Sequence, residues 1–298
     1  MPERRFRHRA EYVTVRLVSA VSRLLPRWMA LRFGGGIGVL FFSLDRRHRQ
    51  HAIDNLAVGF PQWSPRQCAE TARRVFVHFG RLLVELMRFD GLSQDDIRAR
   101  TEIVGLERVQ AAYRQGKGVL FFTGHFGFWE VHALAHGALI APIAVVARPI
   151  DNPMVHALLE RIRTSTGNVV IQRKGALRRI LKALQSNQGV ALLIDQHIQP
   201  ADALVVDFFG RPAATTAALA ALAVRTGAPV IPVFALPLPD GRFRLVYEPA
   251  VAPPADETPE ALKQFTQRCT NVLEMYVRRY PDLWLWMHRR WRIEGGEA

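Results

Sequence analysis

The chain has 298 residues, of which 49% are hydrophobic and 22% are charged. This much apolar material can form a buried core, which argues against a disordered or fibrous protein. The 40 Lys and Arg residues outnumber the 26 Asp and Glu residues, so the formal net charge is +14. Cys68 and Cys269 lie far apart in the sequence, so neither a disulfide framework nor a cysteine zinc site is supported, and a reducing compartment fits best.

More than half of the excess charge lies in residues 1–50, which hold eleven Arg and three acidic residues. Apolar residues over 12–25 predict a helix in which Arg16 and Arg23 are one heptad apart. Arginines interrupt this segment and no Ala-x-Ala site follows, so a cleavable signal is not indicated. Its apolar run is also shorter than the roughly 18 to 20 residues of a membrane-spanning helix.

The next apolar run, from Phe33 to Leu44, is shorter still and rich in glycine. We therefore expect residues 1–45 to form an amphipathic anchor in the membrane interface, with arginine side chains reaching lipid phosphates. The alternative is an ordinary two-helix cap on a soluble domain.

From residue 64 to about 116 the pattern predicts helices, and the period then changes. Short, continuous apolar runs follow, as expected of strands buried on both faces. Strands that alternate with helices of this length indicate a mainly parallel sheet flanked by helices, hence an α/β fold. The strands are predicted over 118–123, 143–147, 169–171 and 190–194, and the helices between them over 128–139, 152–166 and 176–187.

Beyond residue 195 the pattern predicts further strands and helices. No change of composition is strong enough to mark an independent second domain, and the first 60 or so residues look like an appendage. We therefore expect an N-terminal helical membrane-anchoring segment over 1–60 and one α/β domain over 61–298. In this last part the pattern predicts strands over 204–208, 230–235 and 243–247 and helices over 215–226 and 259–280, followed by a tryptophan-rich segment over 283–291.

Polar residues follow several predicted strands, where ligands gather in an open parallel sheet. His125 follows the first strand, and Glu130 lies five residues further on. If a helix begins near Gly127, the Glu130 carboxylate can fold back against His125 and raise its basicity, which would make His125 a general base. In the alternative interpretation His125 only caps the helix and Glu130 is an exposed charge.

The stretch from Thr123 to Glu130 resembles the H-x4-E form of the H-x4-D/E motif of the glycerolipid acyltransferase superfamily, and specifically of the lipid A biosynthesis (late) acyltransferases. The resemblance covers about residues 10–292 and implies a glycerol-3-phosphate acyltransferase-like fold. Its further landmarks are Asn55-Leu56, Phe60-Pro61, Arg148 with Asn152-Pro153, residues 161–167, Asp195-Gln196, residues 209–213 with Thr215 or Thr216, and Trp286 with residues 288–291.

The resemblance implies transfer of a fatty acyl group from a carrier thioester to a hydroxyl of a lipid A precursor. His125 would deprotonate the acceptor hydroxyl and Glu130 would orient His125, so no enzyme nucleophile and no covalent intermediate are needed. Arg163 is the family-like arginine for the oxyanion, expected to pair with Asp195, and Arg148 is a second candidate.

The other expected site residues bind substrate. They are Arg148, Asn152, Asp195 and Gln196, although Asn152 also suits the start of a helix. His132 and His197 lack the spacing of a zinc site, so we expect no metal, and no cofactor beyond an acyl carrier protein or coenzyme A thioester as co-substrate.

The expected partners are a membrane lipid acceptor, the thioester donor and an anionic membrane surface, at the cytoplasmic face of a Gram-negative inner membrane. Aromatic and arginine residues over 284–291 suit a lipid interface, and no RNA-binding signature accompanies them, so no nucleic acid is expected. Two alternatives remain open. One is an acyltransferase for another lipid, such as a phosphatidylinositol mannoside or an ornithine lipid. The other is a basic membrane-surface or nucleic-acid-binding scaffold without catalysis, which leaves the polar strand ends unexplained.

Overall fold

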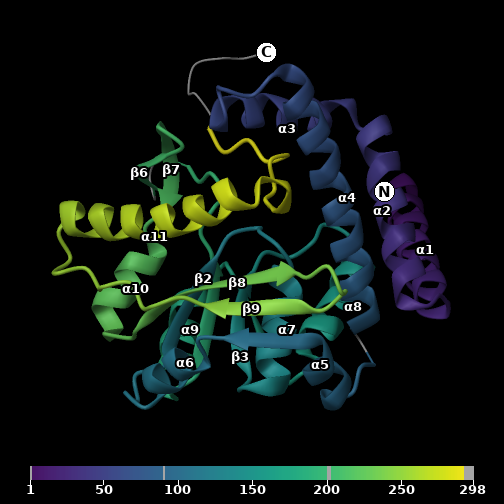
Figure 1. Ribbon diagram of the computed structural model, residues 1–298. Coiled ribbons are helices and arrows are strands. Elements are labelled where there is room, and N and C mark those ends of the chain that lie inside the picture. The colour runs from purple at the N-terminus through teal and green to yellow at the C-terminus, as the bar shows by residue number, and fades with distance from the viewer. Residues whose placement is uncertain (1, 90, 200–202, 292–298) are drawn as a thin grey trace.

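The computed structural model describes residues 2–89, 91–199 and 203–291, and its centre is a seven-stranded sheet (Figure 1). Strands β8 and β9 are antiparallel, and every other pair of neighbours in the sheet is parallel. The prediction of a mainly parallel sheet is therefore confirmed. The spatial order is β1 (Thr101–Val104), β9 (Phe243–Tyr247), β8 (Val230–Pro237), β2 (Val119–Thr123), β5 (Gly189–Leu193), β3 (Ile143–Ala147) and β4 (Val169–Gln172).

Helices cover both faces of the sheet. Alternate side chains of β2 point to opposite faces, so Leu120 and Phe122 join one hydrophobic core and Phe121 joins the other. The first core lies under α9 (Ala176–Gln185), α10 (Ala218–Thr226) and α11 (Pro259–Arg279). The second lies under α5 (Gln94–Arg100), α6 (Leu106–Tyr113), α7 (Trp129–Leu139) and α8 (Pro153–Thr164).

One short strand is absent from the expected pattern. Residues 101–104 form β1 instead of continuing the helices predicted up to residue 116, and β1 pairs with β9 at the edge of the sheet. Four residues are too few to set a period, and the partner strand lies about 140 positions further along the chain. This strand therefore depends on a long-range pairing that local sequence does not contain.

The N-terminal region consists of α1 (Pro2–Leu24), α2 (Arg27–Leu44) and α3 (Arg46–Gly59), which lie along α4 (Pro65–Phe89). The glycines of α2 allow an unusually close crossing with α4. A Cβ atom on Gly34 would lie 2.6 Å from the carbonyl oxygen of Gly80, and one on Gly80 would lie 2.1 Å from that of Gly34. The glycine-rich run is thus a helix-packing surface.

The corner between α1 and α2 is fastened to the last turns of α4 by arginines. Arg23 donates from Nε and Nη2 to the carbonyl oxygen of Met87, at 3.2 and 3.0 Å, and Arg27 pairs with Glu85. Carbonyls in the last turn of a helix have no partner within the helix and attract cations. Arg23 and Arg27 thus bind groups of the protein itself, and the expectation that arginines of this segment reach lipid phosphates stays a prediction.

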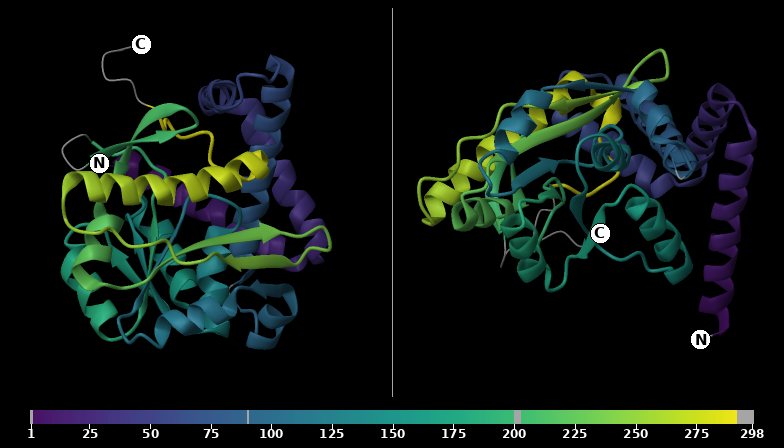
Figure 2. Two further views of the ribbon diagram at one scale, coloured as in Figure 1. Left: turned by 60° about the vertical axis from the view of Figure 1, so that its left-hand side comes forward. Right: turned by 90° about the horizontal axis from the view of Figure 1, so that it is seen from below.

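In the view from below, α1 lies at one edge of the molecule (Figure 2). Within the described residues, no helix combines the length and the apolar character needed to cross a bilayer. Ala52 and Leu56 of α3 belong to the same core as α10 and α11. The division of the chain at residue 60 stays a prediction.

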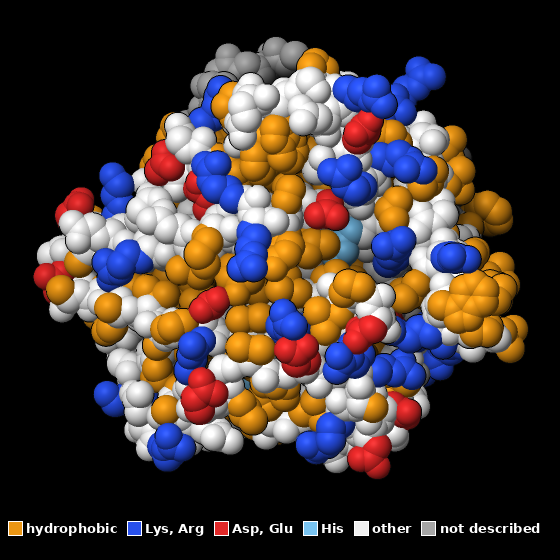
Figure 3. All heavy atoms as spheres, in the orientation of Figure 1, with side chains coloured by type: hydrophobic (Ala, Val, Ile, Leu, Met, Phe, Trp, Pro, Cys, Tyr) orange, Lys and Arg blue, Asp and Glu red, His pale blue; other side chains and the backbone are white. Residues whose placement is uncertain are grey.

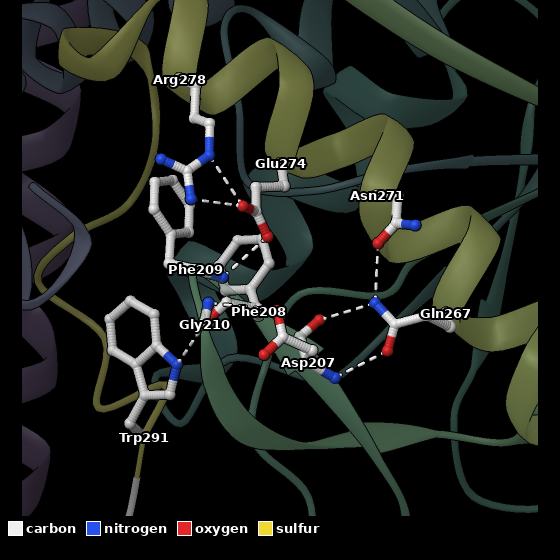
Figure 4. Close-up of polar contacts among 9 residues, drawn as sticks. All are labelled: Asp207, Phe208, Phe209, Gly210, Gln267, Asn271, Glu274, Arg278 and Trp291. Atoms are coloured by element: carbon white, nitrogen blue, oxygen red, sulfur yellow. Dashed lines mark hydrogen bonds and ion pairs between the residues drawn. The ribbon is translucent and has the colours of Figure 1, made fainter.

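A two-stranded antiparallel sheet, β6 (Ala203–Phe208) and β7 (Arg211–Thr216), lies beside α11. The structure places β7 where the start of a helix was expected, and α10 begins only at Ala218. Phe209 in the turn has φ +60°, a left-handed conformation that is costly for a bulky residue. The backbone N–H of Phe209 donates to Glu274 of α11 at 2.7 Å, which holds this turn in place (Figure 4).

Candidate active site

The site is built where β2 and β5 end side by side. In the parallel register of these strands Thr123 lies opposite Leu193, so His125 and Asp195 each follow two residues later. The backbone N–H of His125 donates to Oδ2 of Asp195 at 2.7 Å, and Nδ1 of His125 lies 2.9 Å from Oδ1. One carboxylate therefore fixes both the backbone and the ring of the histidine.

Asp195 is buried, with 3% of its surface exposed. Burial alone would raise the pKa of its carboxyl, but the charge of His125 and the hydrogen bonds from His125 and Trp284 outweigh it and lower the pKa to about 2. The Trp284 indole Nε1–H donates to Oδ2 at 2.8 Å. Asp195 is consequently ionised at neutral pH and accepts hydrogen bonds only.

His125 is 18% exposed at its side chain, and the Trp129 ring packs edge-on against it at 5.2 Å. Burial works to lower the pKa of His125, but the Asp195 carboxylate has the larger combined effect, so this pKa is raised. Because the carboxylate can only accept, Nδ1 carries the proton, and Nε2 of the neutral ring is unprotonated. Nε2 lies 3.4 Å from the side-chain amide nitrogen of Gln196, so this expected site residue does lie at the histidine.

Glu130 does not orient His125, which corrects the expectation from the motif. The Gly127 residue takes a positive φ of +57°, and α7 then begins at Trp129. The first turn of α7 directs the Glu130 carboxylate towards α8, where the Arg163 guanidinium donates from Nε at 2.9 Å and also from Nη2.

The expected pair between Arg163 and Asp195 is likewise wrong, because each residue has another partner. Arg163 and Glu130 form a bidentate, mostly buried ion pair. Burial opposes the charge of Arg163, but the Glu130 hydrogen bond and charge raise its pKa. Both charges also act on His125, since Glu130 raises its pKa and Arg163 lowers it. The ion pair therefore lies beside the histidine and contributes to its electrostatic environment.

Two expected substrate-binding residues form their polar contacts outside this group. Arg148 is 79% exposed and faces Asp151 at 3.8 Å. Asn152 is buried at the start of α8, where its side-chain oxygen accepts from Met154 and its amide donates 2.8 Å hydrogen bonds to the His8 carbonyl and the Glu11 carboxylate. Asn152 thus caps α8 and attaches α1 to it.

The C-terminal segment over 283–288 forms a wall of the site that the sequence did not predict. The backbone N–H of Leu285 donates to the carbonyl oxygen of His125 at 3.1 Å, and that of Gly127 donates to Leu283 at 2.8 Å. Trp284 and Trp286 are fully buried. The expected membrane interface at these tryptophans is therefore wrong. A buried indole N–H needs a hydrogen-bond acceptor, and this requirement is the feature of tryptophan that could have pointed to a polar partner in the site.

Further contacts fasten this wall to the rest of the fold. Asn55 of α3 donates to the carbonyl oxygens of Trp286 and His288, at 2.7 and 2.8 Å. Arg290 is buried and donates to the Ala214 carbonyl of β7 at 2.6 Å and to Thr215. Asn55 and the segment from Trp286 to His288 lie more than 230 positions apart in the sequence, and they contact each other in this wall.

Among the described residues no group of three or more His, Cys, Asp or Glu side chains is placed to hold a metal ion. His132 lies on the buried face of α7, and burial lowers its pKa to about 3. The backbone N–H of His197 donates to Nε2 of His288 at 3.0 Å. The site therefore combines a histidine that is hydrogen-bonded to an ionised aspartate with a neighbouring arginine that is paired with a glutamate. This set suits proton removal from a bound hydroxyl and stabilisation of a developing negative charge.

The family model of the bacterial lipid A biosynthesis acyltransferases matches residues 2–293. A lipid A biosynthesis lauroyltransferase of Escherichia coli K12 is 27% identical over 271 residues, which cover 90% of this chain and 87% of that protein. A phosphatidylinositol mannoside acyltransferase of Mycolicibacterium smegmatis is 22% identical over 74% of this chain and 71% of its own.

Among solved structures, a 1-acyl-sn-glycerophosphate acyltransferase of Thermotoga maritima aligns with 83% of this chain and 97% of its own at 16% identity, with a TM-score of 0.36. A score this low supports no conclusion, so the glycerol-3-phosphate acyltransferase-like fold stays a prediction. The match of the family model over nearly the whole chain excludes the scaffold without catalysis. The chain belongs to the bacterial lipid A biosynthesis acyltransferase family, as the motifs predicted, and is an O-acyltransferase.

Proposed function

We propose that this enzyme transfers a fatty acyl chain from a thioester donor to a hydroxyl of a lipid A precursor, with His125 as the general base. The observation that carries the proposal is the buried, ionised Asp195 against Nδ1 of His125, which leaves Nε2 to take a proton. The lauroyltransferase relative supports this acceptor class.

In the proposed reaction Nε2 of His125 takes the proton of the acceptor hydroxyl while its oxygen attacks the thioester carbonyl carbon. The tetrahedral intermediate then collapses, the carbon–sulfur bond breaks, and the departing thiolate takes the proton from His125. Asp195 stabilises the imidazolium formed in between and keeps the ring in the reactive tautomer. The acceptor supplies the nucleophile, so no covalent enzyme intermediate forms.

Arg163 is proposed to stabilise the oxyanion. Glu130 engages Nε and Nη2, which fixes the plane of the guanidinium, and Nη1 has no hydrogen-bond partner within the described parts of the chain. A prealigned donor of this kind is most effective when it does not have to reorganise during the reaction. Glu130 is therefore a positioning residue for Arg163.

We also propose that α1 and α2 hold the enzyme on the cytoplasmic face of the inner membrane. Figure 3 shows hydrophobic side chains gathered, among Lys and Arg, at the side of the molecule where α1 lies. An exposed apolar ridge surrounded by basic residues suits an anionic lipid surface. The exposed apolar residues of these helices are Phe6, Val13, Leu17, Val21, Leu24, Trp28, Met29, Leu40, Phe41 and Leu44.

The membrane proposal is tested by co-flotation with anionic vesicles at low and high salt. The variant Leu17→Glu/Leu24→Glu should float less than the native protein, whereas the matched control Val205→Glu/Met275→Glu, at exposed apolar positions elsewhere, should float normally. Equal flotation of both variants would place the membrane contact on another surface.

The acceptor is tested by mass spectrometry of lipid extracts from cells with and without the gene. A lipid A species heavier by one acyl chain, present only with active protein, is the expected result. A change confined to a phosphatidylinositol mannoside or an ornithine lipid would replace the proposed acceptor with that lipid. A phosphatidylinositol mannoside acyltransferase is among the proteins similar to this chain.

A further inference from the structure

The net positive charge of the chain is concentrated in two segments. Residues 1–50 carry +8, and residues 161–194 contain seven Lys and Arg without a single Asp or Glu. The remaining residues together carry −1, because the whole chain carries +14. The first segment includes the proposed membrane contact, while the second has no role in the reaction described above except through Arg163.

Most of the exposed cations of this second segment lie at the start and on the outer face of α9, which we call the α9 surface. It consists of Arg173, Lys174, Leu177, Arg178 and Lys182, all of them exposed. Within the described ranges these four cations form no ion pair, so their charge is not compensated by the protein itself. Leu177 is 49% exposed in their midst.

The α9 surface begins at the same edge of the sheet as the catalytic residues. It follows the carboxyl end of β4, where the backbone N–H of Arg173 donates to the carbonyl oxygen of Ala147 at the end of β3. Three strand intervals separate β4 from β2, which at about 4.8 Å each amounts to roughly 14 Å. A flexible arm attached to a molecule on this surface could therefore reach His125.

The two basic regions lie on different sides of the sheet. Asn152 attaches α1 to α8, whose Ile162 joins the core beneath α7, whereas Ala176 and Ile180 of α9 join the opposite core. A flat membrane in contact with the ridge on α1 would not also lie against α9. The second region therefore calls for a different partner.

We propose that the α9 surface docks an acidic carrier protein that presents the acyl thioester to His125. This inference rests on the proposed function and adds the surface on which its donor docks. Uncompensated cations attract an acidic partner and speed its association, and the central Leu177 offers an apolar contact. Coenzyme phosphates, by contrast, are bound by convergent N–H donors in a concave site, and an exposed helix face with a leucine at its centre is not of that kind.

The test compares Lys174→Glu/Arg178→Glu with the control Arg114→Glu/Lys263→Glu, which changes the net charge equally at exposed positions elsewhere. Purified bacterial acyl carrier protein bearing a dodecanoyl chain is titrated against each full-length variant without acceptor, so binding is measured apart from turnover. We expect the Kd to rise at least tenfold for the α9 variant only, and a carrier with reversed acidic residues to restore binding.

Kinetics with three dodecanoyl donors complete the test. The α9 variant should show a raised KM for the carrier-bound donor with unchanged kcat, and unchanged activity with dodecanoyl-pantetheine. Unchanged binding of the carrier would overturn the proposal. An equal rise in KM for dodecanoyl-coenzyme A would make the surface a phosphate site instead, and loss of vesicle flotation would make it a membrane contact. If native protein binds the carrier but transfers no acyl chain from any donor, the proposed function fails while the docking surface stands.

Discussion

The substitution Asp195→Asn distinguishes the role of Asp195 from that of Glu130, the other carboxylate near His125. The native side chain accepts from the backbone N–H and Nδ1 of His125 and from Trp284. An amide of the same shape keeps the packing but loses the charge. If its NH₂ group turns towards Nδ1, the imidazole proton moves to Nε2, where it blocks acceptance of the substrate proton.

The size of the effect follows from the pKa of Asp195, which falls from its ordinary 3.8 to about 2. At 1.36 kcal/mol per pH unit, the folded surroundings favour the ionised carboxylate by about 2 kcal/mol. Much of that coupling stabilises the imidazolium in the transition state. Together with the wrong tautomer, its loss should lower kcat/KM by a factor on the order of 10³ to 10⁴.

The assay is the pH dependence of kcat/KM for the native enzyme, Asp195→Asn and the matched variant Glu130→Gln. The acid limb of the native pH profile, where kcat/KM falls as the pH is lowered, should have its midpoint above pH 6.5. The pKa of His125 is raised, and the neutral base is lost as the pH falls through that pKa. In Asp195→Asn the group that most strongly opposes the burial of His125 is neutralised, so the residual activity should persist to lower pH.

Glu130→Gln should lower kcat through Arg163 and shift the limb less, since Asp195 has the larger effect on the pKa of His125. An unshifted limb in Asp195→Asn, with a large shift in Glu130→Gln, would refute this assignment of the carboxylates.

Arg163→Ala should reduce kcat by about 10² to 10³ through loss of the oxyanion donor, and an unchanged kcat at saturating donor would contradict that role. Gly80→Ala should destabilise the fold by about 1 to 3 kcal/mol, because its Cβ would lie 2.1 Å from the Gly34 carbonyl oxygen, and an unchanged Tm would count against the close crossing. Asn55→Ala should cost about 1 to 3 kcal/mol by leaving two partly buried carbonyls unpaired, with faster hydrogen exchange over residues 284–288 as the expected signature.

The strands of the core were predictable because they are buried on both faces. Continuous apolar runs such as 119–123 and 189–193 leave few alternatives to a covered parallel sheet, and the helices between them have clear periods. Strands β1 and β7 were missed, since neither has such a run. Each forms only because a partner strand offers it hydrogen bonds, and local sequence does not contain that partner.

The site was predictable as a set of residues but not as a set of pairs. His125, Glu130, Arg163, Asp195 and Gln196 all lie in or beside it. Which carboxylate faces the histidine depends on the spatial order of strands, which places β5 directly next to β2 although β3 and β4 come between them in sequence. The short spacing in the sequence favoured Glu130 as the partner of His125, whereas the register between β2 and β5 places Asp195 there.

The most direct test of the central claim is the transfer rate of purified His125→Gln measured in a single turnover with the acyl donor and lipid acceptor. Gln keeps a polar side chain of similar size but cannot take a proton, so the rate should fall by about two to four orders of magnitude in protein that stays folded. The exposed His48→Gln is the matched control and should react at the native rate. Near-native transfer by folded His125→Gln would contradict the general-base mechanism.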